Sequence, residues 1–247
     1  MESFRRIADV ILLLVALVAF WQGLYWFVGE VGISSPWETV LHALELLGQP
    51  QFWPHVRESL HAFAYSLVLA WIGGVAIGVW LGAHRLSGDV AEPILVALYS
   101  LPKVTLYPLI LLVFGLGMPA KVAFGAIHGI FPVMIFTLNA VKNIKPVYLK
   151  TARSMNLSPG QAATTILIPA TLPEVVTGLR VGFSLTLLGV LIGEMFASQR
   201  GLGFIIINAI GLDYVPRMMA VTLMLFVFAA LANAGLLALD RHLHKRV

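Results

Sequence analysis

Apolar residues dominate six long stretches of the chain, and short polar segments separate these stretches from one another. A helix needs about 20 apolar residues to cross the hydrocarbon core of a bilayer, and each stretch reaches that length. The pattern predicts six transmembrane helices, at about 7–28, 60–83, 91–114, 119–141, 173–197 and 217–239. We therefore expect an all-α polytopic membrane protein.

The composition agrees with this interpretation. Of the 247 residues, 59% are hydrophobic and 11% are charged, whereas soluble domains average about 45–50% apolar and about 25% charged residues. The absence of cysteine excludes disulfide frameworks and cysteine-based metal sites. The net charge of +4 does not indicate nucleic-acid binding, because the basic residues lie at segment ends and not along one stripe.

The first apolar stretch superficially resembles a secretory signal, since it follows the basic start MESFRR. It runs from 7 to 28, which is longer than the roughly 7–15 residues of a signal core, and no small-residue cleavage site follows it. We interpret it as a retained span that ends in an aromatic belt of Trp21, Tyr25 and Trp26.

The segment at 29–58 is too polar to cross a membrane. Ser35, followed by Pro36 and by Glu38, predicts a helix that begins with a capping box, and the pattern after it is amphipathic. We expect this helix to lie on the membrane surface. The chain thus divides into 1–58, the first transmembrane helix plus an external amphipathic segment, and 59–247, a core domain with five transmembrane helices.

Regularly spaced glycines mark places where helices should touch. Gly74, Gly78 and Gly82 form a small-xxx-small stripe in the second span, and Gly125 with Gly129 forms a shorter one in the fourth. Such stripes let the backbone of another helix approach closely, which holds helices together in lipid. We interpret them as packing signals.

Prolines and a glycine-containing turn indicate two places where the helical backbone is interrupted. Pro102 and Pro108 interrupt the third span around Lys103, and irregular backbone at this depth is tolerated where it is buried in protein or lines a cavity. After the fifth span, GLG followed by FIIINAI predicts a turn and then an interfacial or re-entrant helix that is too short to cross.

The sequence of the loop at 142–173 predicts two short helices. Pro146 suits the first turn of a helix, where its missing N–H would have no partner, and Asn156 suits the end because asparagine tolerates the left-handed conformation. The apolar face of this helix would comprise Tyr148, Ala152 and Met155, and the basic face Lys150 and Arg153.

Two capping boxes follow that helix. Ser158 pairs with Gln161, with Pro159 at the first helical position, and Thr171 with Glu174 repeats the box at the start of the next apolar run. The loop would then be a compact basic knob at the membrane surface. We expect such a knob to dock into another protein.

Lysine and arginine indicate the orientation. With the amino terminus inside, inner segments hold ten of the 16 basic residues, outer segments hold Arg57, Lys121, Arg200 and Arg217, and two lie within spans. The inner ten are Arg5, Arg6, Arg85, Lys142, Lys145, Lys150, Arg153, Arg241, Lys245 and Arg246. The positive-inside rule therefore places both termini and the 142–173 loop in the cytoplasm.

The same loop resembles the cytoplasmic signature of permease subunits of binding-protein-dependent ABC importers. That signature reads E-A-A, three residues, G, nine residues, I, two residues and P, and its spacing holds here from Lys150 to Pro169. Ala152, Ile166 and Pro169 are identical to it, and 97 residues follow Lys150. Lys150, Thr151 and Asn156 replace the glutamate, the middle alanine and the glycine.

Further segments resemble the nitrate/sulfonate/taurine type of this family, so that the likeness covers about residue 55 to the end. They are LPKVTLYPLILLVFGLG (101–117), ATLPEVVTGLR (170–180), GEMFAS (193–198) and GLGFIII (201–207). The resemblance implies the type I ABC importer permease fold, six transmembrane helices with a two-helix cytoplasmic coupling loop that sits in a groove of an ATPase. The coupling residues it implies are Pro146, Tyr148, Lys150, Thr151, Ala152, Arg153, Met155, Asn156, Ser158, Ile166 and Pro169.

The resemblance also implies partners. Two copies of the chain would form a homodimer in the lipid of a bacterial inner membrane, with two ATPase subunits beneath and an extracytoplasmic solute-binding protein on the outer face. The chain contains no GxxxxGK[ST] motif for phosphate binding. We therefore expect no cofactor and no catalysis in this chain, because ATP and Mg²⁺ would be held by the ATPase.

Polar residues inside the spans are candidates for a translocation path. Lys103 and Arg180 would favour an anionic solute, but Lys103 could instead form an ion pair or cap free carbonyls, and Arg180 could reach the headgroups. Glu194 would contact solute or close an outer gate, or else form an interhelical hydrogen bond. His128 has no partner at metal-ligand spacing and is interpreted as a packed, hydrogen-bonded histidine.

A secondary transporter or channel is the competing interpretation. It would show inverted repeats and several intramembrane carboxylates, whereas the sequence shows no convincing repeat and only Glu194 deep in a span. A membrane-embedded enzyme would gather polar residues at one depth, and here they are scattered. The solute stays open among nitrate, taurine and other sulfonates, bicarbonate and thiamine-precursor pyrimidines, because the binding protein would set most of the specificity.

Overall fold

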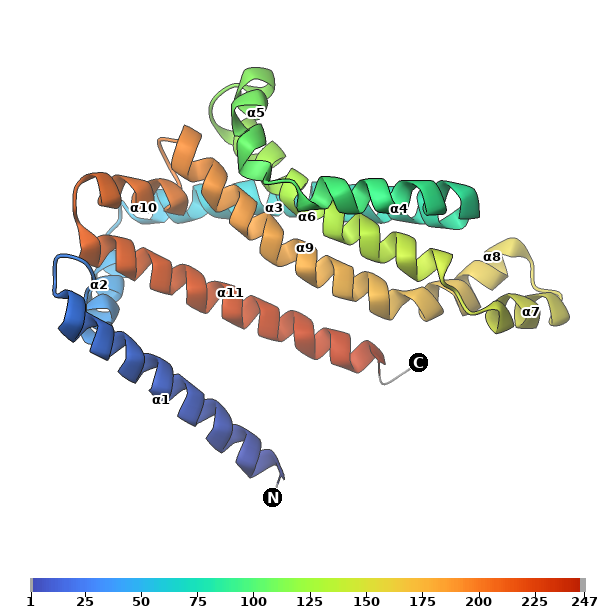
Figure 1. The fold of residues 1–247 in the computed structure, drawn as a ribbon, viewed down its shortest axis with the longest axis horizontal. Helices are drawn as coiled ribbons and strands as arrows, with labels where there is room; N and C mark the ends of the chain where they lie inside the picture. The colour runs from blue at the N-terminus through green and yellow to red at the C-terminus, as the bar shows by residue number, and fades with distance from the viewer. Residues whose placement is uncertain (1, 245–247) are drawn as a thin grey trace.

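A computed structural model describes residues 2–244 of the chain, with the side chains of 2–7, 197 and 239–244 left out. Arg5, Arg6, Arg241, Lys245 and Arg246, which contribute to the orientation argument, therefore lie outside the described side chains. Within residues 2–244 the chain is almost entirely helical (Figure 1).

The helices follow one another with short connections. Their bounds are α1 Glu2–Val28, α2 Pro36–Gly48, α3 Trp53–Ala83, α4 Arg85–Ser100, α5 Tyr107–Phe114, α6 Met118–Lys142, α7 Pro146–Ser154, α8 Pro159–Ala162, α9 Ile168–Ala197, α10 Leu202–Gly211 and α11 Val215–His244. A 3₁₀ turn, Lys103–Leu106, precedes α5, and a π turn, Ala163–Leu167, joins α8 to α9.

Helices α3, α6 and α9 form the centre of the bundle (Figure 1). A Cβ added at Gly78 would lie 2.7 Å from the Met134 carbonyl oxygen, and one at Gly82 would lie 2.7 Å from the Leu138 carbonyl oxygen, both on α6. A Cβ at Gly129 on α6 would collide with the Thr186 side chain of α9 and lie 3.0 Å from the Gly182 carbonyl oxygen. The predicted close approach along both glycine stripes is confirmed.

The third predicted span, 91–114, is broken in two. Helix α4 begins at Arg85 and ends at Ser100, and the next helical segment, Lys103–Phe114, turns away from it by 84° (Figure 1). Pro102 removes a backbone donor where the helix ends, and Pro108 occupies a first-turn position of α5, where the missing donor costs nothing. The prolines therefore end one helix and start another instead of kinking a single one.

The predicted helix start at Thr171 and Glu174 is wrong. Thr171 lies inside α9, and its hydroxyl donates to the Leu167 and Ile168 carbonyl oxygens at 3.0 and 3.2 Å, as an interior helical threonine does. The helix runs without a break from Pro159 to Phe196. The π turn lies directly before Pro169, which has no N–H to continue the regular ladder, so a local widening replaces the predicted break.

Helix α2 forms as predicted but packs on protein. Ser35 accepts from the Glu38 N–H and the Glu38 carboxylate accepts from the Ser35 N–H, which completes the predicted capping box. Ala43 and Leu46 on its apolar face join a core with Ile205 of α10 and Val221 of α11. The division expected between residues 58 and 59 falls inside α3, which begins at Trp53.

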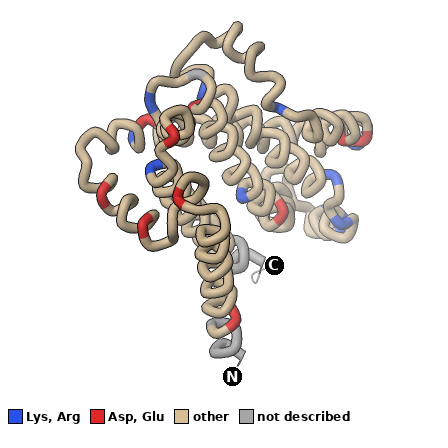
Figure 2. Tube along the Cα trace, turned by 60° about the vertical axis from the view of Figure 1, so that its left-hand side comes forward, with Lys and Arg blue, Asp and Glu red and all other residues tan. Residues whose placement is uncertain are grey.

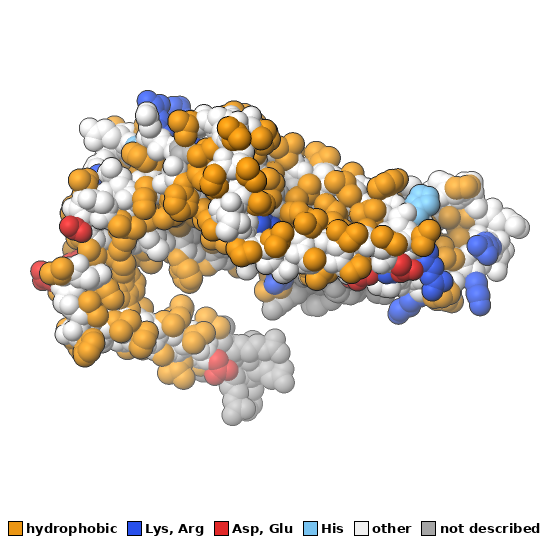
Figure 3. All heavy atoms as spheres, turned by 45° about the horizontal axis from the view of Figure 1, so that its top comes forward, with side chains coloured by type: hydrophobic (Ala, Val, Ile, Leu, Met, Phe, Trp, Pro, Cys, Tyr) orange, Lys and Arg blue, Asp and Glu red, His pale blue; other side chains and the backbone are white. Residues whose placement is uncertain are grey.

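The two ends of the bundle differ. Helix α1 begins below the bundle and runs toward the end that carries α2 and α10, and α11 runs back from that end in the direction of α7 and α8 (Figure 1). Charged residues lie mainly near helix ends and turns, with long uncharged stretches between them (Figure 2). The face in Figure 3 is apolar over the middle of the bundle, and basic side chains gather at its right-hand end, where α7 and α8 lie.

Gly78→Ala should destabilise the protein, because the added methyl group would collide with α6 backbone and force the two helices apart. Overpacking of this kind costs about 1–3 kcal/mol. Thermal or denaturant unfolding of the purified protein in detergent checks this. Gly235→Ala on α11 is the matched control, because no atom lies within 4 Å of the added methyl group; equal stability of the two variants would contradict the packing role.

Candidate functional site

The loop between α6 and α9 begins with a tightly closed helix. Pro146 is the first residue of α7, and Asn156 follows the helix with φ +50°, the left-handed conformation predicted for it. The Asn156 N–H donates to the Arg153 carbonyl and the Leu157 N–H to the Ala152 carbonyl, both at 3.0 Å. These two bonds form a Schellman motif, which stops α7 and turns the chain toward α8.

Helix α8 begins with the predicted capping box. The Gln161 N–H donates to the Ser158 hydroxyl at 3.4 Å, and the Ser158 N–H donates to the Gln161 side-chain oxygen at 3.0 Å. Between α7 and the start of α9 lies a shallow hollow lined by Tyr148, Thr151, Ile166 and Pro169 among others. The structure thus brings four of the predicted coupling residues around one depression.

The apolar face predicted for α7 is only partly exposed on the surface of the chain. Ala152 is 7% exposed and packs inside the chain, so it offers no surface to a partner. The large apolar side chains that α7 and its cap expose are Val147, Leu149 and Met155, and the last of these is 63% exposed. Lys150, Arg153, Asn156 and Ser158 are also exposed.

Lys103 caps the break between α4 and α5. Its ammonium donates to the Tyr99 carbonyl oxygen at 2.8 Å and lies 4.7 Å from the Tyr99 ring centroid and 5.5 Å from that of Phe131. Within the described residues no carboxylate lies at ion-pair distance from it. Of the alternatives for Lys103, the structure shows a half-buried cation that caps a carbonyl and faces two aromatic rings.

His128 and Arg180 lie on the central helices. The His128 ring is buried against the Phe124 ring on α6, and its Nδ1 is 2.8 Å from the Phe124 carbonyl oxygen. Among the described residues no group of His, Asp and Glu could hold a metal ion. Arg180 is half-buried on α9.

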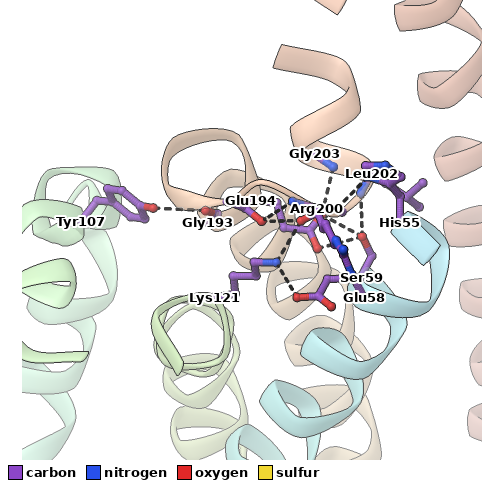
Figure 4. A network of polar contacts seen from close by, with 12 residues as sticks. His55, Glu58, Ser59, Tyr107, Lys121, Gly193, Glu194, Arg200, Leu202 and Gly203 are labelled. Carbon is purple, nitrogen blue, oxygen red and sulfur yellow. Dashed lines mark hydrogen bonds and ion pairs between the residues drawn. The ribbon is translucent and has the colours of Figure 1, made fainter. Parts of the chain in front are cut away.

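Glu194 lies at the centre of a polar cluster at the end of the bundle opposite α7 (Figure 4). Its carboxylate is fully buried, and it accepts from the Ser59 hydroxyl at 2.8 Å and from the Gly203 N–H at 2.9 Å. Because Ser59 is on α3 and Glu194 on α9, this is the interhelical hydrogen bond that was one of the two interpretations of Glu194.

Lys121 belongs to the same cluster, although the sequence reasoning treated it only as an outer charge. Its side chain is 1% exposed, and its ammonium donates to the Glu58 carboxylate at 3.0 Å and to the Arg200 carbonyl oxygen at 2.9 Å. Tyr107 also reaches the cluster, since its hydroxyl donates to the Gly193 carbonyl at 3.1 Å. The available signal was two opposite charges, Glu58 and Lys121, at the starts of two spans on one side.

A second ion pair ties helices at the opposite end. The Lys142 ammonium lies 2.6 Å from the Asp89 carboxylate and 2.8 Å from that of Glu92. Since Lys142 ends α6 and both carboxylates are on α4, these contacts fix α4 beside the start of the α7–α8 loop.

The chain is similar to known transport proteins. It is 27% identical over 250 residues to the taurine transport system permease protein TauC of Escherichia coli (strain K12), which covers 97% of this chain and 90% of TauC. It is 29% identical over 218 residues to the nitrate import permease protein NrtB of Leptolyngbya laminosa, which covers 84% of this chain and 77% of that protein.

The fold also has a solved counterpart. An inward-facing structure of the MetNI methionine ABC transporter matches with a TM-score of 0.67 and 19% identity, over 79% of this chain and 98% of that one. This likeness confirms the predicted type I importer permease fold. Residues 74–247, more than half of the chain, match the family described as binding-protein-dependent transport system inner membrane component, and the protein belongs to that family.

Proposed function

We propose that the chain forms the membrane path of an ATP-driven importer for a small solute that is an anion or carries an anionic group, such as nitrate, the sulfonate of taurine or another sulfonate. The observation that carries the solute class is the half-buried ammonium of Lys103, which no described carboxylate pairs. In a low-dielectric path such a cation favours an anionic group, and the similar permeases TauC and NrtB are named for taurine, which carries a sulfonate group, and for nitrate.

The proposed assembly contains two copies of this chain, two ATPase subunits and an extracytoplasmic solute-binding protein. The ATPase would bind the α7–α8 loop through the exposed residues Leu149, Lys150, Arg153 and Met155, while Ala152 supports the loop from inside. ATP and Mg²⁺ would be bound on the ATPase. A movement of the loop would be transmitted to the membrane-spanning helices through Pro159–Phe196. This helix is continuous, so the loop and the span would move together.

Passage of an anion requires attraction without tight binding, because a strongly held solute would leave slowly. Lys103 meets this condition, since its ammonium is already shared with the Tyr99 carbonyl and two ring faces. Arg180 would serve as a second cation along the path. A pyrimidine would gain less from these cations, and an ion-coupled transporter would run without an ATPase.

Orientation follows the same proposal, with both termini and α7 in the cytoplasm. The chain has no cysteine, so single cysteines report their side directly. Ser87→Cys and Ser154→Cys should react with an impermeant maleimide only in inside-out vesicles, and Gln199→Cys should react in right-side-out vesicles or intact cells. Ser154 and Gln199 are exposed and Ser87 is half-buried; labelling of Ser154→Cys in intact cells would contradict the orientation.

Leu149→Glu and Met155→Glu should weaken ATPase binding. Both side chains are exposed in the single chain, and burying such a side chain at an interface contributes about 1.5–3 kcal/mol, so the loss should be tenfold or more. Co-purification of the ATPase with tagged permease measures it. Asn156→Gly is the matched control, because glycine keeps the left-handed turn; normal co-purification of both Glu variants would exclude this face.

Lys103→Met should lower the maximal rate of anion uptake about tenfold while the complex still assembles, because one charge is removed from the path and not from the external binding protein. Uptake of labelled taurine and of nitrate into reconstituted proteoliposomes, with basal ATP hydrolysis as the assembly control, measures it. Arg180→Met is tested in parallel. Full uptake in both variants would overturn the anion path and leave the two residues as structural groups.

A further inference from the structure

The turn between α9 and α10 is held in an unusual way. Four consecutive residues, Arg200 to Gly203, each form a backbone hydrogen bond with a side chain from a neighbouring part of the bundle (Figure 4). The Arg200 carbonyl accepts from Lys121 at 2.9 Å. The next three N–H groups donate to His55 Nδ1 at 3.2 Å, to the Ser59 hydroxyl at 2.7 Å and to the Glu194 carboxylate at 2.9 Å.

These four side chains come from three helices. His55 and Ser59 lie one helical turn apart on α3, Lys121 is on α6 and Glu194 is on α9. The first N–H groups of a helix have no partner inside it, and they usually bond to a capping side chain or to water. Here side chains of the three central helices take that place, so the start of α10 is fixed to all of them.

Ser59 links α3 to both α9 and α10. Its hydroxyl donates to Glu194 and accepts from the Leu202 N–H, so one oxygen joins α3, α9 and α10. Ser59 is 6% exposed and Glu194 is fully buried. Loss of this hydroxyl would therefore leave a buried carboxylate and a partly buried N–H each short of one partner.

The glycines of the turn fit this arrangement. Gly201 has φ +127°, which side chains other than glycine rarely adopt, and a Cβ there would collide with the Glu194 carboxyl group. A Cβ at Gly203 would collide with the Leu191 carbonyl oxygen. The GEMFAS and GLGFIII segments thus interlock, since the glutamate of the first needs the two glycines of the second.

We propose that His55, Ser59, Lys121 and Glu194 are positioning residues for transport: they hold the α9–α10 turn so that α10 and the ends of α3, α6 and α9 move as one rigid unit. Apolar side chains would hold this region together with less desolvation cost, but a fully satisfied polar network specifies one arrangement. The unit presents the exposed residues Gln199 and Arg200, beside a hollow lined by Glu58 and Leu116, in one fixed conformation. That this end faces outward rests on the proposed function.

Ser59→Ala tests the proposal, with Ser59→Thr as the matched control. Threonine keeps the hydroxyl, and its added methyl group has room because Ser59 also lines an apolar cavity between α2, α3, α9 and α11. Amide hydrogen exchange of the purified protein reports the turn directly. In Ser59→Ala, exchange at 201–205 should rise at least about tenfold while the middle of α3 and α6 is unchanged, and Ser59→Thr should behave as the wild type.

Transport supplies the second measurement. The maximal rate of taurine uptake should fall at least about fivefold in Ser59→Ala at equal amounts of membrane-inserted protein, and Ser59→Thr should restore it. Unchanged exchange in Ser59→Ala, or a loosened turn with full uptake, would overturn the proposal. If Ser59→Ala does not accumulate, His55→Phe replaces it, because a phenyl ring keeps the stack on Phe204 and removes only the acceptor for the Gly201 N–H.

The two proposals fail in different ways. If the wild-type complex does not import taurine, the solute assignment is wrong. The rate of solute-independent ATP hydrolysis by the assembled complex is then compared between the wild type and the Ser59 variants in place of the uptake rate. If the wild type imports taurine and both Ser59 variants do so equally well, only the positioning role is overturned.

Discussion

A polar group inside hydrocarbon has no water to bond with, and this constraint governs the arrangement of the whole protein. Where the helical ladder stops, some other group must take over its donors and acceptors. At the break after α4, the Lys103 ammonium binds the Tyr99 carbonyl. At the start of α10, three N–H groups donate to the side chains of His55, Ser59 and Glu194. Irregular backbone therefore coincides with the charged and polar side chains of the spans.

Close packing by glycine supplies the rest of the cohesion. Since lipid tails are as apolar as the helix surfaces, helices associate through direct backbone contact more than through exclusion of water. The contacts of Gly78 and Gly82 with α6, and of Gly129 with α9, bring the central helices to backbone distance. The hydrogen bond between Ser59 and Glu194 then links α3 to α9 at one end, and the ion pairs of Lys142 link α6 to α4 at the other.

Much of this could be predicted from the sequence, because the signals are local. Glycine spacing and the capping residues Ser35, Pro146, Asn156 and Ser158 each depend on a few neighbouring residues, and these features have the expected geometry. The errors arose where local signals compete. Thr171 and Glu174 match a capping box, but the helix preceding them was already continuous. The outer cluster was missed for another reason: Lys121 and Glu58 are 63 residues apart, and only the packed bundle places them together.

The same cluster has a consequence for how the chain enters the membrane during synthesis. Ser59 emerges from the ribosome well before its partners, which lie 135 and 143 residues further along the chain. The Ser59 hydroxyl therefore lacks these partners until three further spans, the third, fourth and fifth, have been made, and Lys121 lacks its bond to the Arg200 carbonyl for as long. The bundle can close at this end only after α9 has crossed the membrane. Insertion of the fifth span is thus the step that locks the earlier ones into place.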